Sequence, residues 1–122
     1  MSGRTQGILY IYYNDDEANR AVYHLREGEN IIGANAYNEV VIPYPGISGT
    51  HCKITITNGE YSIENISNSE GLYKQGTGDT RQMLKNAKEY ELVPNKPYYL
   101  LNKHKIIFVP SPQSKYLVDF LN

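Results

Sequence analysis

The sequence of 122 residues contains no tryptophan and a single cysteine, Cys52. One cysteine cannot form an intramolecular disulfide, and no cluster of cysteine and histidine has the ligand spacing of a zinc site. We therefore expect a protein of a reducing compartment, the cytosol or the nucleus, with no bound metal.

Long apolar runs and an excess of charge of either sign are also missing. No stretch approaches the length of a membrane span, the first residues lack the apolar run of a signal peptide, and the formal net charge is −1. A chain this close to neutral has no global attraction to nucleic acid or to an anionic membrane. We expect neither as a direct partner.

Tyrosine is the abundant aromatic residue, with 12 copies. It favours β-strands and can cover a sheet with its ring while its hydroxyl stays in water. The composition therefore indicates an all-β chain, whose tyrosines are either ordinary sheet residues or, in part, a surface for a partner. The length suits one domain, residues 1–122, with a core from about residue 7 to residue 120.

Short apolar segments alternate with turn residues along the chain, and no window has a persuasive helical period. The clearest segment is 54–63, where Asn58-Gly59 lies between two alternating runs and tolerates the positive φ angles of a type I′ turn. A two-residue turn there pairs Thr57 with Glu60 and puts the isoleucines on one face. This hairpin is the firmest structural prediction from the sequence.

Further strands are expected along the rest of the chain, and we expect 81–85 to pair with 88–92. The expected strands are 8–13, 21–25, 30–33, 39–42, 72–75, 81–85, 88–92, 98–101, 105–109 (with 106–108 buried) and 115–120. About eleven short, mostly antiparallel strands predict a β-sandwich.

An enzymatic function finds little support, because the three histidines belong to no recognisable nucleophile or metal motif. Cys52 follows His51 directly, so their side chains point to opposite faces of a strand and Cys52 is expected in the core. Ser48 lies three residues before His51 in a loop rich in proline and glycine. Its hydroxyl either binds an anion together with backbone N–H groups or makes a local turn bond, and His51 is expected to fix the loop.

Three motifs occur in order: Ile31-Ile32-Gly33, then Ser48-Gly49-Thr50-His51, then NISNSEGL at residues 65–72. In this order and spacing they resemble the forkhead-associated (FHA) domain family over nearly the whole chain. The family is an eleven-stranded β-sandwich that binds phosphothreonine with loops at one end. The resemblance implies a non-catalytic protein-binding domain with no cofactor.

The sequence departs from the family pattern at several positions of this site. The resemblance places the phosphate-binding arginine at Ala34, a frequently basic residue at Gly49, and the asparagine that fixes the peptide backbone at Glu70, ahead of Gly71. Ser48 and His51 are retained. The site is therefore predicted to be vestigial, unless basic residues from elsewhere reach it; the candidates are Arg26, Lys53, Lys74 and Arg81.

Within the family, the first half of the chain is most similar to the N-terminal FHA domains of nuclear adaptor proteins that associate with DNA breaks. This implies a nuclear, homodimeric module that contacts other proteins, chromatin or DNA-repair factors among them, with phosphothreonine binding weak or lost. The alternative is a functional phosphothreonine reader that uses Ser48. Candidate residues of a dimer face are Tyr10, Tyr12, Tyr13, Tyr98 and Tyr99.

Overall fold

The computed structural model describes residues 5–67 and 71–111. The first sheet contains six strands in the order β2-β1-β11-β10-β7-β8, and the second contains five in the order β4-β3-β5-β6-β9. The strands are β1 (Thr5–Tyr12), β2 (Arg20–Arg26), β3 (Gly28–Gly33), β4 (Val40–Val41), β5 (Cys52–Thr57), β6 (Glu60–Asn65), β7 (Leu72–Gln75), β8 (Arg81–Met83), β9 (Glu89–Glu91), β10 (Pro97–Leu100) and β11 (His104–Pro110).

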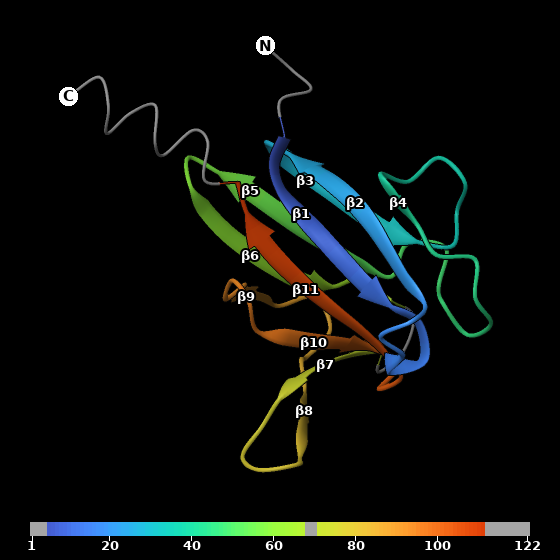
Figure 1. The fold of residues 1–122 in the computed structure, drawn as a ribbon. Coiled ribbons are helices and arrows are strands. Elements are labelled where there is room, and N and C mark those ends of the chain that lie inside the picture. The colour runs from blue at the N-terminus through green and yellow to red at the C-terminus, as the bar shows by residue number, and fades with distance from the viewer. Residues whose placement is uncertain (1–4, 68–70, 112–122) are drawn as a thin grey trace.

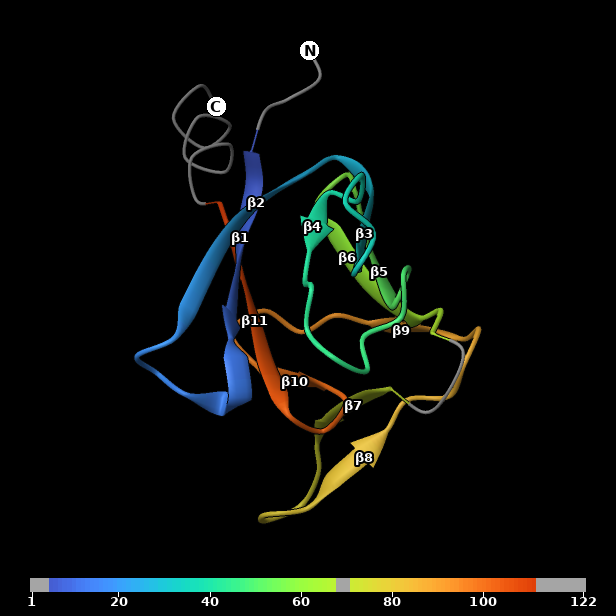
Figure 2. The same cartoon turned by 90° about the vertical axis from the view of Figure 1, so that its right-hand side faces the viewer.

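The two sheets form the layers of a sandwich (Figures 1 and 2). Neighbouring strands are antiparallel except β3 and β4, which are parallel. Leu9 and Phe108 of the six-stranded sheet and Ile54 and Ile63 of the five-stranded sheet have no exposed surface and belong to one core. The prediction of an all-β sandwich is confirmed. Within the described residues no helix is long and apolar enough to span a membrane, and the expected strand at 115–120 lies outside these residues.

The hairpin of β5 and β6 has the register predicted from the sequence. Thr57 pairs with Glu60 and Ile54 pairs with Ile63. Asn58 and Gly59 at the turn have φ angles of 51° and 80°, as a type I′ turn requires. The alternation of apolar residues and the Asn58-Gly59 turn specify the same register. The register of this hairpin was therefore predictable without the rest of the fold.

The predicted pairing of 81–85 with 88–92 is wrong. Strand β8 pairs with β7, with Tyr73 opposite Met83, and β9 pairs with β6, with Ile63 opposite Tyr90. The chain between β8 and β9 crosses from one sheet to the other, and the buried Leu84 anchors this crossing in the core. The expected burial of 106–108 is also only partly correct, because Ile107 lies between the inward-facing Ile106 and Phe108 and is partly exposed.

Candidate functional site

The loop that carries Ser48 lies directly against the end of β3. The N–H of Ala34 donates to the Ser48 carbonyl at 2.9 Å, and the N–H of Asn35 donates to the Gly49 carbonyl at 3.1 Å. A Cβ atom on Gly33 would overlap the Gly49 carbonyl oxygen, which is backbone and cannot rotate away. Glycine is therefore required at position 33 for the two segments to approach this closely.

His51 connects this loop to the segment that begins β7. Its side chain is fully buried, and its Nδ1 atom accepts a hydrogen bond of 3.1 Å from the Ser48 N–H. The ring proton is therefore on Nε2, which donates to the Gly71 carbonyl at 2.9 Å. Burial lowers the pKa of His51, and the bond to Gly71 opposes this shift in part. The neutral imidazole holds two loops in one arrangement.

The loop after β3 is fastened by amide side chains. Asn38 donates from Nδ2 to the Gly49 carbonyl at 2.7 Å, and a Cβ on Gly49 would lie 2.8 Å from Oδ1 of Asn35. The Ala34 side chain is partly buried and packs against the core. Tyr37 lies at the tip of the same loop and is 85% exposed.

The sequence model of the FHA domain family matches residues 30–108. The chain belongs to the FHA domain family. FHA domains are phosphopeptide-binding modules for protein interactions and are generally not enzymes. No curated protein gives a significant match to the chain.

Solved FHA domains share the fold at low sequence identity. The FHA domain of the CT664 protein from Chlamydia trachomatis has a TM-score of 0.68 and 21% identity, over 88% of this chain and 99% of its own. A structure from a study of phosphothreonine-dependent FHA domain interactions has a TM-score of 0.67 and 22% identity, over 87% and 98%. The FHA domain of human APLF, in complex with an XRCC1 bisphospho peptide, has a TM-score of 0.66 and 18% identity, over 84% and 98%.

The site residues predicted from the FHA pattern meet in space as far as the structure describes them. The Ser48 carbonyl accepts from the Ala34 N–H and the Gly49 carbonyl accepts from the adjoining Asn35 N–H. His51 links Ser48 to Gly71. Glu70 lies outside the described residues. The fold thus brings these three segments together, with Ala34 directly after β3.

Basic residues proposed as substitutes are held in other places. The Nζ atom of Lys53 lies 3.3 Å from Glu29 and 3.6 Å from Glu64 on the outer face of the five-stranded sheet. The guanidinium carbon of Arg81 lies 3.5 Å from the centre of the Tyr99 ring.

Arg26 pairs with Thr5 where β2 passes toward β3, at the far end of the sandwich from Ser48. Lys74 lies in β7 opposite Gln82 of β8. Neither position is in the segments that form the loops around Ser48.

The five candidate dimer tyrosines do not form one surface. Tyr13, Tyr98 and Tyr99 are buried, with 8%, 4% and 5% of their surface exposed. Tyr10 and Tyr12 alone among the five lie partly exposed on the outer face of β1, where Arg20 and Lys105 lie over their rings. The sequence could not separate the buried tyrosines from the partly exposed ones, because tyrosine occurs on both the core face and the solvent face of a strand.

The sequence did not predict a cluster of three aromatic rings next to the site, in which Tyr13 and His104 are buried and Tyr44 is partly buried. The Tyr13 and Tyr44 rings are stacked with centroids 4.3 Å apart, and the His104 ring meets the Tyr44 ring edge-on at 5.2 Å. Burial raises the pKa of Tyr13 to about 12. Nδ1 of His104 accepts from the Asn14 N–H at 2.9 Å, while Nε2 is buried with no hydrogen-bond partner among the described residues.

Proposed function

We propose that this FHA domain is a protein-interaction module whose phosphothreonine site is degenerate and which acts chiefly through other surfaces. The observation that carries the proposal is the environment of Ala34. Its N–H is used by the Ser48 carbonyl and its methyl group packs against the core. The position that the family gives to a phosphate-binding arginine offers no charge here.

The expected loss of affinity is large. A charge-assisted hydrogen bond to phosphate contributes roughly 1.5–3 kcal/mol. Losing the arginine at position 34 and the asparagine at position 70 removes about 3–5 kcal/mol, which is two to three decades or more in Kd. A carboxylate at Glu70 adds about 1 kcal/mol of repulsion if it lies ~6 Å from a phosphate in water-like surroundings.

The proposal includes self-association within a nuclear adaptor of the DNA-damage response. Its support is the resemblance of the first half of the chain to the N-terminal FHA domain of the mediator of DNA damage checkpoint protein and its insect counterpart, the mutator protein. A second support is the outer face of the six-stranded sheet, where Val22, Tyr10 and Ile107 are neighbours across three strands. Val22 is 45% exposed, and an exposed apolar side chain next to a partly exposed tyrosine is available for a protein contact.

Two measurements test the proposal. Light scattering at increasing concentration should give the mass of a dimer, and Val22→Glu should reduce it to that of a monomer. Val93→Glu, the same change at an exposed valine between β9 and β10, is the matched control. A strictly monomeric wild-type domain would refute self-association.

Titration with phosphothreonine peptides tests the degenerate site. The wild-type domain should bind them weakly or not at all, and the double variant Ala34→Arg, Glu70→Asn should gain phosphate-dependent binding. Low-micromolar binding by the wild type, absent for the unphosphorylated peptide, would refute this part.

The second candidate function is a working phosphothreonine reader. It is favoured by the intact support that runs from Ser48 through His51 to Gly71, and by the fold shared with the APLF domain in its complex with a bisphospho peptide. Under this alternative, the wild type binds phosphothreonine peptides and Ser48→Ala abolishes the binding. The same titration therefore separates the two functions.

A further inference from the structure

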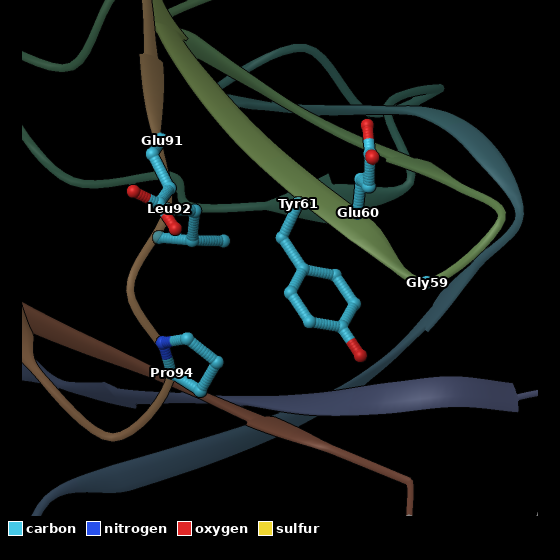
Figure 3. Close-up of a pocket in the computed structure, with 6 residues that line it drawn as sticks. All are labelled: Gly59, Glu60, Tyr61, Glu91, Leu92 and Pro94. Carbon is cyan, nitrogen blue, oxygen red and sulfur yellow. The ribbon is translucent and has the colours of Figure 1, made fainter. Parts of the chain in front are cut away.

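A recess of about 500 Å³ opens at the hairpin end of the sandwich, far along β5 and β6 from the loop that holds Ser48. Figure 3 shows the Tyr61 ring on one side of it, with Leu92 and Pro94 facing this ring from the other. Tyr61 also packs at 60° against Phe108, with ring centroids 4.9 Å apart. Tyr61, Leu92 and Pro94 thus form an apolar wall that is fixed by the core, and Glu60 and Glu91 also line the recess.

A second hollow of about 200 Å³ lies beside the recess on the outer face of the five-stranded sheet. Thr55, Thr57 and Ser62 contribute hydroxyl groups, and Glu60 and Glu89 contribute carboxylates. Glu60 and Tyr61 line both hollows. As neighbours on a strand they point to opposite sides, and in Figure 3 the Glu60 side chain points away from the Tyr61 ring.

The outer face around the second hollow carries an excess of negative charge. Glu64 lies directly opposite Glu89 on the neighbouring strand, an arrangement of like charges that is destabilising. Lys53 neutralises part of this charge through Glu64 and Glu29. In the described part of the chain, Glu60 and Glu91 take part in no ion pair. A cation bound at Glu89 would relieve this repulsion, and Glu60 lines the same hollow.

We propose that these two hollows form a docking site for an extended segment of a partner protein in which an arginine adjoins an apolar residue. Neighbouring side chains of an extended segment point to opposite sides, which matches the acidic hollow on the Glu60 side and the apolar wall of Tyr61, Leu92 and Pro94 on the other. Guanidinium is the cation that fits, because its planar set of donors can bind two carboxylates and a hydroxyl together. The apolar residue lies between Tyr61 and Pro94. This surface is separate from the phosphothreonine site.

The test uses acetyl-Gly-Ser-Arg-Leu-Gly-Ser-amide, titrated into the ¹⁵N-labelled domain and followed by NMR. Amide shifts should change at residues 59–62, 89 and 91–92. Replacing the arginine by neutral citrulline, or the leucine by alanine, should weaken binding about threefold or more. The double variant Glu60→Gln, Glu89→Gln should weaken it similarly, whereas Asp79→Asn, the same change at an exposed turn between β7 and β8, should not.

Three results would overturn the proposal. One is equal binding of the citrulline and arginine peptides. Another is shift changes that fall at residues 33–35 and 48–51 rather than around Tyr61. The third is a homodimer that Glu60→Gln, Glu89→Gln dissociates, because the occupant would then be a second copy of the domain. Retention of the dispersed wild-type amide spectrum by each variant shows that a loss of binding is not a loss of folding.

Discussion

Two buried histidines should make the stability of this domain fall as the pH falls below about 6.5. His51 and His104 are 0% and 1% exposed, and burial is the leading cause that lowers the pKa of each. For His104, the charge of Lys103 lowers the pKa further, as does the charge that His51 carries when it is protonated. In the folded state both rings are therefore neutral at pH values where an unfolded histidine is already protonated.

The sign and size follow from proton linkage. Above the unfolded pKa of about 6.5 neither state binds a proton at these sites, so the full stability is present. Between the unfolded and folded pKa values the unfolded chain binds more protons, and each histidine costs up to about 1.4 kcal/mol per pH unit. The two together cost at most about 2.7 kcal/mol per unit, which is a large part of the stability of a small domain.

Urea unfolding at pH 7.5, 6.5, 6.0 and 5.5 measures this slope above the range in which most carboxylates titrate. His104→Gln should lower the stability at pH 7.5 and reduce the slope by about half, because one of the two protons is removed. His24→Gln, in the exposed position of β2, controls for the loss of an imidazole. A free energy of unfolding that stays constant from pH 7.5 to 5.5 would refute the neutral, buried assignment of both rings.

Three further predictions concern the core and the loops. Gly33→Ala should destabilise the domain by about 2 kcal/mol or more in urea unfolding, because its Cβ overlaps the Gly49 carbonyl; Gly78→Ala, which meets no atom within 4 Å, should cost less despite its positive φ. Cys52 should resist thiol reagents until the protein unfolds, since burial raises its pKa to about 12; rapid labelling of the folded domain would contradict this. Arg81→Met should lower stability by about 0.5–2 kcal/mol, because it removes the cation over the Tyr99 ring together with the hydrogen bonds to Asn102 and the ion pair with Asp15; an unchanged unfolding midpoint would contradict it.

The parts of the fold that were predictable from the sequence are those encoded locally. The turn at Asn58-Gly59 sets the register of its own hairpin, so pattern and chemistry agreed there. The sequence predicted that β8 pairs with 88–92 instead of β7, because the three residues of β8 contain no pattern that distinguishes one sheet from the other. Its pairing with β7 depends on the crossing anchored by Leu84, which is a property of the assembled core.

The candidate site shows the same division. The sequence predicted that His51 fixes the loop that carries Ser48, because the two positions are only three residues apart. The hydrogen bond from the Ser48 N–H to His51 is the contact that does so. The contacts of Lys53 with Glu29 and of Arg81 with the Tyr99 ring were not predictable from the sequence. The partner of a long side chain depends on which strands become neighbours when the sheets pack. The contact of His51 with Gly71 likewise joins segments 20 residues apart.

The acidic face of the five-stranded sheet has a consequence for how the domain meets any charged surface. Its glutamates lie on one side of the sandwich, while Arg20 and Arg26 lie exposed on β2 in the other sheet. The net charge of −1 therefore does not describe these two surfaces, one of which is locally acidic and the other locally basic. Such a molecule turns in the field of a charged neighbour before contact, which selects its approach at low ionic strength and fades as salt shortens the Debye length.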